Sequence, residues 1–410
     1  MLGNSTKTSI EQTLTKPSAE ISIINIVESI IEFAYDSRAS DIHLSPTENA
    51  FKVRVRIDGV LQDSFTVPVE IHQEIISRIK VLSGLRTDEH NTPQDGRFKF
   101  MTKDKKTRFD IRVSIMPTHY GENAVLRLLV EQGETFNLEN IGFSKRDIKA
   151  IRHAISKPYG MILATGPTGS GKTTTLYTIL RELNNPDVSI ITIEDPIEYS
   201  LEGVDQIQVN SQTGLTFARG LRSILRQDPN IIMVGEIRDN ETAGIAVNAA
   251  LTGHLLLSTL HTNDAATTLP RLLDMEIEPF LIASTVNIAI GQRLVRKLCN
   301  ICKLKKELTE KELESLKETF PMEHLGKSKI FYSPVGCKEC SKTGYISRIG
   351  IHEVLEMTEA IRNAIVARAS SAEIRRIAIS EGMTTMLQDG INKAKEGITS
   401  LEEILRVIHE

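Results

Sequence analysis

The sequence predicts an α/β protein in which a domain built on a parallel sheet follows a smaller α+β domain. Near-continuous apolar runs alternate with helical stretches between residues 161 and 260, which is typical of parallel strands covered by helices on both faces. A glycine-rich loop directly follows the first of these runs, and short alternating runs occupy residues 41–129. The length of 410 residues exceeds that of one compact domain and indicates two or three domains.

The composition, 40% hydrophobic and 25% charged, is that of a globular protein with substantial cores. A net charge of −4 and a pI near 6.3 give no general reason to expect nucleic acid as a partner. No run approaches the ~20 apolar residues of a membrane span, and the polar N-terminus lacks the apolar core of a signal peptide. We therefore expect a cytoplasmic protein, and we expect residues 1–20 to form a flexible tail.

The predicted α+β domain covers residues 21–130. Apolar residues recur at helical spacing from Ile21 to about Ala34, which predicts an amphipathic helix. Alternating runs at 41–46, 51–67 and 108–129 then predict strands, and Asp58-Gly59 supplies a hairpin turn between two of them.

A polar segment with a glycine, residues 131–143, is the expected linker to a second domain at 144–410. The strands of this second domain are predicted from four apolar runs, at 161–166, 188–195, 231–236 and 254–260. The chain ends in a predicted helix over 397–408, with a capping box formed by Thr399 and Glu402.

The segment GPTGSGKTT matches the phosphate-loop pattern G-x4-G-K-[ST] and follows the predicted strand MILAT. Its glycines allow backbone N–H groups to turn inward around phosphate oxygens, where a Cβ would obstruct. The lysine places a positive charge on the β- and γ-phosphates, and the threonine after it offers a hydroxyl to Mg²⁺. The predicted nucleotide-binding residues are Gly166, Pro167, Thr168, Gly169, Ser170, Gly171, Lys172, Thr173 and Thr174.

Nucleotide hydrolysis also requires carboxylates at neighbouring strand ends, to hold Mg²⁺ and to orient the attacking water. Glu194 ends one predicted strand, and Glu236 ends another in the position of a Walker B acid. His254 and His261 stand at the two ends of a further strand, and a histidine beside a γ-phosphate can stabilise charge. The alternatives are solvated strand-end acids and histidines that bond to nearby backbone.

The four cysteines form two C-x2-C pairs separated by residues 303–336, a segment in which we expect a helix at 306–320. Two such pairs can supply the four thiolates of a structural Zn²⁺ site. Reduced free thiols or a redox role are the alternatives, and catalytic zinc is disfavoured because no ligand position would stay open. The predicted ligands are Cys299, Cys302, Cys337 and Cys340.

Taken together, the motifs resemble the ATPases of type II secretion and type IV pilus assembly, the GspE/PulE and PilB class, over about residues 21–410. The phosphate loop is joined by an Asp box, a Walker B stretch and a His box in the family's order. The matching segments are ASDIHL (39–44), PQDGRF (93–98), FDIRVSIMPTHYGENAVLRLL (109–129), IEDPIEY (193–199), RSILRQDPNIIMVGEIRD (222–239), GHLLLSTLHTNDA (253–265), CNIC (299–302) and GCKECSKTGYISRIGIHE (336–353).

The resemblance implies a RecA-like ATPase domain that carries a tetracysteine zinc subdomain at about 296–348, preceded by a small PAS-like α+β domain. It implies a homohexamer that binds ATP between the two domains of a subunit. Lys172 and Thr173 would contact phosphates and metal, with Glu236 as a second Mg²⁺ ligand. Glu194 and Glu236 would divide water activation and metal binding, with Glu194 favoured as the base, and His261 would face the γ-phosphate.

The family's N-terminal arginines, which complete its nucleotide site, correspond to Arg97 and Arg112, with Arg127 a weaker candidate. From the residues alone, an arginine on an alternating strand can equally be solvated, although neutralising a phosphate from outside the loop is the usual arginine-finger role. Three further arginines surround the Walker B stretch and would serve the site or subunit contacts: Arg222, Arg226 and Arg238.

The resemblance implies an ATP-hydrolysing motor that acts on an inner-membrane platform protein, and through it on pilin or pseudopilin, while associating with the membrane through these partners. The cysteine pairs favour an assembly or secretion motor over the retraction-type pilus motor, which is the alternative. A nucleic-acid translocase is disfavoured by the absence of a basic stripe and of Trp, and a small-molecule kinase or inactive scaffold is disfavoured too. Asn230 departs from the family's usual Asp, and we expect the family's further N-terminal docking domain to be missing.

Overall fold

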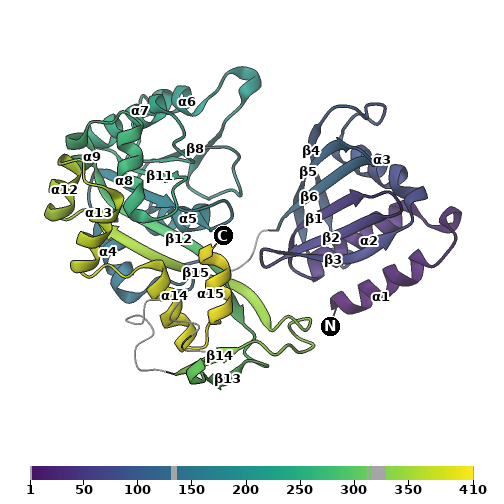
Figure 1. The fold of residues 1–410 in the computed structure, drawn as a ribbon. Helices are drawn as coiled ribbons and strands as arrows, with labels where there is room; N and C mark the ends of the chain where they lie inside the picture. The colour runs from purple at the N-terminus through teal and green to yellow at the C-terminus, as the bar shows by residue number, and fades with distance from the viewer. Residues whose placement is uncertain (1, 131–135, 312–313, 315–328, 410) are drawn as a thin grey trace. The chain divides into compact units, whose positions relative to one another are not determined.

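The computed structural model describes residues 2–130, 136–311, 314 and 329–409, and the side chains of residues 6–408 within these ranges. It divides into two compact units, Met1–Glu134 and Thr135–Glu410 (Figure 1). The division falls inside the linker predicted at 131–143. The predicted linker extends too far toward the C-terminus, because Leu138 and Phe143 are buried in the core of unit 2.

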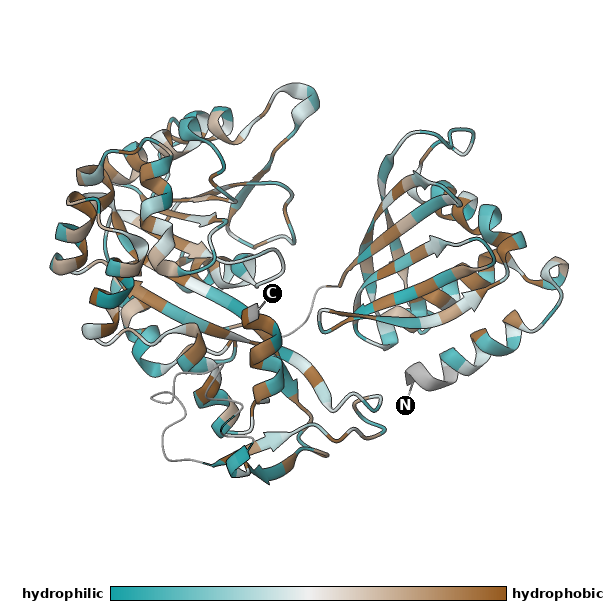
Figure 2. Cartoon of the chain, in the orientation of Figure 1, coloured by the Kyte–Doolittle hydropathy of each residue, from teal (hydrophilic) through white to brown (hydrophobic). Residues whose placement is uncertain are grey.

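Unit 1 contains a six-stranded antiparallel sheet in the order β3-β2-β1-β6-β5-β4. Its strands alternate apolar and polar residues, seen as brown and teal bands in Figure 2, so one face is buried and the other is polar. The predicted turn at Asp58-Gly59 is confirmed, with both residues at positive φ. The strands are β1 Ala39–Pro46, β2 Phe51–Ile57, β3 Val60–Val67, β4 Gln94–Met101, β5 Arg108–Thr118 and β6 Gly121–Leu129.

The helices of unit 1 are α1 Leu2–Leu14, α2 Ile23–Asp36 and α3 His72–Ser83, with short 3₁₀ turns at Ser18–Glu20 and Val69–Ile71. The predicted helix from Ile21 is confirmed as α2. The prediction of a flexible tail was wrong, because α1 forms and contacts α2. Ile10 and Leu14, one helical turn apart, join the core of the unit, and Ile10 is only 1% exposed.

Unit 2 is built on a seven-stranded sheet in the order β15-β12-β7-β11-β10-β8-β9, in which only β15 runs antiparallel to its neighbour. The predicted parallel sheet is confirmed, since each of the four apolar runs covers most or all of one of its buried strands. A small β13–β14 hairpin stands apart from it. The strands are β7 Gly160–Thr165, β8 Ile190–Glu194, β9 Asp205–Gln208, β10 Ile231–Val234, β11 Leu255–Leu260, β12 Val286–Leu298, β13 Leu304–Glu307, β14 Ile330–Ser333 and β15 Tyr345–Glu356.

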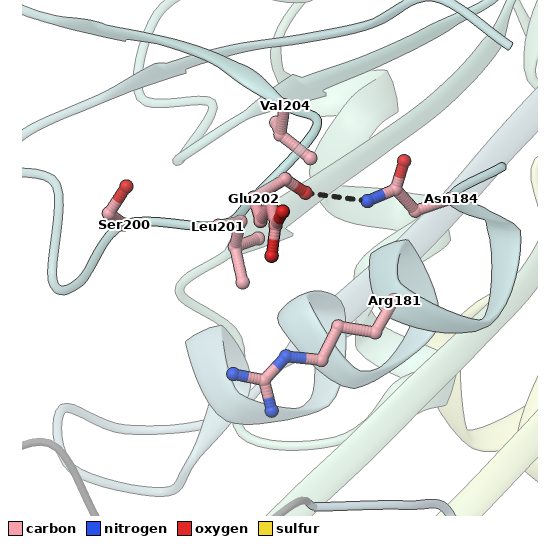
Figure 3. A pocket seen from close by; sticks show the side chains of 6 residues that line it. All are labelled: Arg181, Asn184, Ser200, Leu201, Glu202 and Val204. Carbon is pink, nitrogen blue, oxygen red and sulfur yellow. Dashed lines mark hydrogen bonds between the residues drawn. The ribbon is translucent and has the colours of Figure 1, made fainter. Parts of the chain in front are cut away.

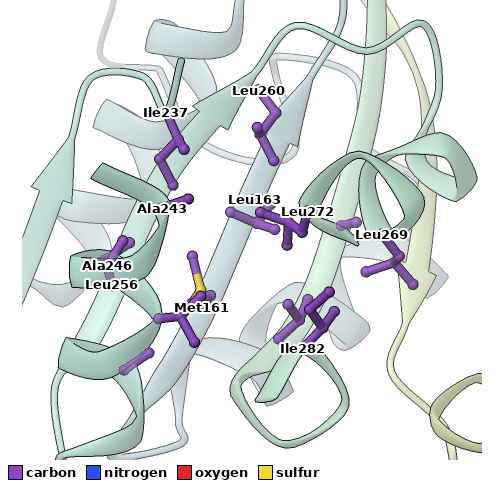
Figure 4. Packing of buried hydrophobic residues seen from close by; sticks show 14 of the residues in the cluster. Met161, Leu163, Ile237, Ala243, Ala246, Leu256, Leu260, Leu269, Leu272 and Ile282 are labelled. Atoms are coloured by element: carbon purple, nitrogen blue, oxygen red, sulfur yellow. The ribbon is translucent and has the colours of Figure 1, made fainter. Parts of the chain in front are cut away.

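Helices cover both faces of this sheet (Figure 1). Met161 and Leu163 of β7 point into one core with residues of α6 to α9, and Figure 4 shows the packing of those from α7, α8 and α9. Ile162 and Ala164 point into the other core with α4 and α5. The helices are α4 Lys145–Ile155, α5 Lys172–Leu183, α6 Phe217–Ile224, α7 Asn240–Leu251, α8 Ala265–Asp274, α9 Pro279–Thr285, α12 Glu359–Val366, α13 Ser371–Ser380, α14 Met386–Lys395 and α15 Leu401–His409, with a 3₁₀ turn at Ser211–Thr213.

Two further sequence predictions need correction. The last helix forms as α15, but Ser400, not Thr399, caps it by accepting the Glu403 N–H, while the Thr399 hydroxyl donates to the carbonyl of Arg296. The helix expected at 306–320 starts too early, because Leu304–Glu307 is strand β13; most of its remaining length lies outside the described residues. None of the described helices is long and apolar enough to cross a bilayer.

Candidate functional site

The phosphate loop lies between β7 and α5, at the carboxyl edge of the parallel sheet. Gly166, Gly169 and Gly171 all have positive φ, which side chains other than glycine rarely adopt. A Cβ on Gly166 would lie 2.4 Å from the carbonyl oxygen of Gln292, whereas the space beside Gly169 is open. The loop therefore follows a path that requires glycine, and the positive end of α5 points at it, as anion binding needs.

Lys172, the first residue of α5, is held at this loop. Its Nζ donates to the carbonyl oxygens of Gly166 at 2.8 Å and Pro167 at 3.0 Å. The side chain is largely buried, and burial lowers its pKa while the negative charge of Glu236 opposes the shift. An ammonium group in a poorly solvated place interacts strongly with an incoming phosphate.

Glu236 lies just past β10, beside the end of the neighbouring strand β11. One of its carboxylate oxygens is 2.5 Å from Nη2 of Arg238, and the other is 2.8 Å from Nε2 of His261. The carboxylate is mostly buried, whereas the two partners are about half exposed or more. The predicted acid and histidine are thus brought together, and Glu236 is also the acid whose charge acts on Lys172.

Glu194 ends β8 and is held in a different network. Its Oε2 accepts a hydrogen bond from the hydroxyl of Tyr177, and its Oε1 accepts from Thr192 at 2.6 Å and from Gln206 at 3.1 Å. Burial and the neighbouring carboxylate raise the pKa of Tyr177, so its hydroxyl stays protonated as the donor. A carboxylate has about four acceptor positions, so these three donors leave about one for another partner.

Two contacts that the sequence analysis missed support the loop from neighbouring strands. Thr165, at the end of β7, accepts the N–H of Thr262 and donates to its carbonyl oxygen at 2.8 Å, which joins the loop to the segment after His261. Gln292 of β12 bonds to Ser170 and Thr175. The sequence carries no signal that sets Gln292 apart, because β12 contains other polar residues such as Asn287 and Arg293.

Other predicted residues lie elsewhere or have other partners. His254 precedes β11, at the opposite edge of the sheet from the phosphate loop, and bonds to the carbonyl oxygen of Ala249. Arg222 pairs with Glu241 at 2.7 Å, and Arg226 donates to the carbonyl oxygen of Arg222. Asn230, the departure from the family pattern, accepts the N–H of Ser189 and so still makes a polar contact.

Arg97 and Arg112 belong to unit 1 and face each other across β4 and β5. They are part of one row that crosses five strands on the polar face of the sheet, in the order Arg56, Asp41, Arg127, Arg112 and Arg97. Asp41 accepts from Nε of Arg127 at 2.9 Å and lies 3.7 Å from Nε of Arg56. We call these four arginines the arginine row.

The four cysteine sulfurs lie within 4.8 Å of one another, beside the β13–β14 hairpin. Three of their Sγ–Sγ separations are 3.7 to 3.8 Å, which is far too long for disulfides. They match the ~3.8 Å edge of a tetrahedron with metal–sulfur bonds of ~2.3 Å. Although burial opposes the shift, backbone N–H groups of Cys337 and Gly344 help to lower the pKa of Cys340, whereas burial raises the pKa of Cys302 in the same cluster.

A separate hollow of about 320 Å³ lies between the end of α5 and the segment that joins β8 to β9 (Figure 3). Its lining residues are Arg181, Asn184, Ser200, Leu201, Glu202 and Val204. It lies at the opposite end of α5 from the phosphate loop, and none of the predicted site residues lines it. We therefore do not assign it to the nucleotide site.

Comparison with known proteins identifies the family. The profile of the family described as "Type II/IV secretion system protein" matches residues 17–406. The type IV pilus assembly ATPase PilB of Myxococcus xanthus is 44% identical over 96% of this chain and 69% of its own length. The type II secretion system protein E of Xanthomonas campestris is also 44% identical, over 100% of this chain and 71% of its own.

Solved structures agree with the fold. The pilus retraction motor PilT with bound ADP has a TM-score of 0.61 and 28% identity, and the match covers 92% of this chain and 96% of PilT. The ATPase DotB of Legionella pneumophila has a TM-score of 0.68 at 23% identity, over 95% and 97% of the two chains, which supports the fold alone. The resemblance inferred from the motifs is therefore confirmed: the chain belongs to the type II/IV secretion system protein family, and it is an ATPase.

Proposed function

We propose that this protein is a Mg-ATP-hydrolysing motor of type IV pilus assembly or type II secretion. The observation that carries the proposal is the grouping of Lys172, Glu236 and His261 around a glycine-dependent phosphate loop, in a chain whose relatives at 44% identity bear these names. The assembly or secretion motor is preferred to a retraction motor because PilT is less similar, at 28% identity.

In the proposed site, the loop N–H groups and Lys172 would bind the phosphates, while Thr173 and Glu236 would hold Mg²⁺. When bound, Mg²⁺ would neutralise phosphate charge. The chain fits this group, since it places a hydroxyl-bearing residue directly after Lys172 and a carboxylate close enough to act on that lysine. His261 would keep Glu236 oriented and present a hydrogen bond toward the γ-phosphate.

Glu194 is our proposed base for the attacking water, the role that the family resemblance favours. Tyr177, Thr192 and Gln206 fix its carboxylate, and about one acceptor position remains through which it could orient a water molecule. This division of roles leaves Glu236 for the metal, in agreement with its position beside Lys172 and His261.

The arginine row of unit 1 would supply positive charge to the phosphates from Arg97 and Arg112, in the same or a neighbouring subunit. Like charges directly opposite each other in a sheet are destabilising, yet Arg127, Arg112 and Arg97 lie opposite one another on three adjacent strands. Asp41 balances part of this charge through its bond to Arg127, and the alignment of the arginines on adjacent strands supports an anionic ligand for the row.

We further propose that the cysteine cluster binds one structural Zn²⁺ within a subdomain at about 296–348. The donor set fits, because all four sulfurs lie within 4.8 Å of one another and three of their separations, 3.7 to 3.8 Å, match the edge of a tetrahedral site. The metal would fix the β13–β14 hairpin to the end of β12.

The complete motor would be a cytoplasmic homohexamer of RecA-like domains preceded by PAS-like domains. It would associate with the inner membrane through a platform protein and act through it on pilin or pseudopilin. Light scattering measures the molar mass of the full chain with and without a non-hydrolysable ATP analogue and Mg²⁺. We expect six times the 45.6 kDa chain mass with the analogue; a monomer under both conditions would contradict the ring.

A further inference from the structure

Gln292 is an almost fully buried polar side chain, 1% exposed, in the middle of strand β12. β12 runs parallel to β7 and continues beside the phosphate loop, with Gly291 opposite Thr165. Both ends of the Gln292 amide are used: Nε2 donates to the carbonyl oxygen of Ser170 at 2.8 Å, and Oε1 accepts from the hydroxyl of Thr175 at 2.8 Å.

The two partners lie on either side of Lys172. Ser170 is within the loop, and Thr175 is in the first turn of α5, so one amide fixes the loop and the helix that it leads into. The backbone of Gln292 also lies against Gly166, since a Cβ there would meet its carbonyl oxygen at 2.4 Å. Gln292 thus contacts the loop at its beginning, through its main chain, and near its end, through its side chain.

The two hydrogen bonds of the Gln292 amide affect how the loop binds phosphate. When the carbonyl of Ser170 is bonded to Gln292, it points toward β12, and the peptide groups around it are fixed in orientation. A loop that binds phosphate through N–H groups must keep its carbonyl oxygens turned away from the anion. Without the amide, the loop would have to be ordered when the ligand binds, which reduces affinity.

We infer that Gln292 is a positioning residue for nucleotide binding, which sets the phosphate loop in its anion-binding shape without touching the nucleotide. The inference rests on the proposed nucleotide site. Because the loop has the same shape for substrate and transition state, loss of the Gln292 hydrogen bonds should weaken binding of both equally. Such a loss raises KM and leaves kcat nearly unchanged.

Gln292→Met tests this, because methionine fills a similar volume and removes both hydrogen bonds. Calorimetry on the full chain should show the Kd for Mg-ADP raised at least tenfold, which is 1.4 kcal/mol, and steady-state assays should show KM for ATP raised with kcat within about threefold. Gln292→Glu keeps the acceptor for Thr175 but turns a carboxylate toward the carbonyl of Ser170, so a larger rise in Kd is expected.

Asn287 offers a matched control on the same strand. It is also buried, and its amide donates to the carbonyl oxygen of Tyr159 at 2.9 Å, at the amino end of β7, away from the loop. Asn287→Leu should lower the melting temperature and leave the Kd for Mg-ADP unchanged. Thr175→Val combined with Gln292→Met should weaken binding no more than Gln292→Met alone, since both remove the same contact.

A purely structural role for Gln292 makes a different prediction. In that case both Gln292 variants would reduce the melting temperature and the number of binding-competent sites, while the remaining sites kept the wild-type Kd; that result overturns the inference. If the wild-type protein itself binds no Mg-ADP, the proposed nucleotide site fails first. If it binds and the Gln292 variants bind equally well, only the positioning role fails.

Discussion

Replacing Glu236 by Gln removes one charge from the proposed site while nearly preserving shape. In the structure this carboxylate pairs with Arg238 at 2.5 Å and with His261 at 2.8 Å, and its charge opposes the lowering of the Lys172 pKa. The amide can still bond to one partner through its oxygen. It cannot bind Mg²⁺ as a charged ligand or compensate the charge of Lys172.

The cost to folding should be small. The side chains of Arg238 and His261 are 64% and 48% exposed, so both remain hydrated once their contacts with the carboxylate are lost. An exposed ion pair such as that of Arg238 contributes less than about 1 kcal/mol. The cost to catalysis should be large, because loss of one preorganised charge-stabilising group lowers kcat by about 10²–10³, or about 2.7–4 kcal/mol. Activity and stability should therefore separate in this variant.

The assay is phosphate release at saturating Mg-ATP, together with the melting temperature of the same preparation. We expect kcat to fall by about two to three orders of magnitude while the melting temperature changes by only a few degrees. Turnover within threefold of wild type would refute the role of Glu236, and a collapse of the melting temperature would assign it to the fold instead.

The remaining predictions concern metal and stability. Elemental analysis should find about one zinc per chain, lost in the Cys337→Ser, Cys340→Ser variant; a metal-free native protein would contradict the zinc site. Lys80, fully buried, lies 2.6 Å from Glu122, so Glu122→Gln should cost about 3–5 kcal/mol in urea unfolding, whereas Asp88→Asn, in an exposed pair, should cost almost nothing. Although burial opposes it, hydrogen bonds from Lys80 and a histidine hold the pKa of Glu122 below 4.5. The stability that the Lys80–Glu122 pair contributes should thus be present above pH 4.5 and be lost as the pH falls through the lower pKa of Glu122 in the folded state. A free energy of unfolding that does not change over this acidic range would exclude the contribution of the pair.

Local patterns were sufficient to predict the sheet of unit 2 and its phosphate loop. Parallel strands that are buried on both faces read as near-continuous apolar runs, and the loop between MILAT and α5 carries its own geometric requirement for glycine. Glu236 and His261 could be placed together because parallel strands end at the same edge of a sheet. Their separation of 2.8 Å needed the structure.

The missed contacts join residues that are distant in sequence. Gln292 meets Ser170 across 122 positions, and Thr165 meets Thr262 across 97, so no local spacing could have indicated either pair. Tyr177 lies within helix α5, and only the packing of α5 beside β8 gives it Glu194 as an acceptor.

The wrong predictions have a common cause. Residues 1–20 are polar in composition, but Ile10 and Leu14 provide enough apolar contact to fix α1 against α2. Likewise, Thr399 and Ser400 both suit a helix cap. A tertiary contact decides between them, because the hydroxyl of Thr399 donates its hydrogen bond to the carbonyl oxygen of Arg296. Composition describes a segment's average tendency, whereas a few buried contacts decide its structure.

Calorimetric titration of the magnesium-supplied full chain with ADP, beside the Lys172→Ala variant, tests the central claim most directly. The account predicts saturable binding of ADP to the wild-type protein. It predicts no measurable binding to Lys172→Ala, although this variant keeps its melting temperature, because the ammonium group of Lys172 is held at the phosphate loop by the carbonyl oxygens of Gly166 and Pro167. Equal binding by the two proteins, or no binding by the wild type, would contradict it.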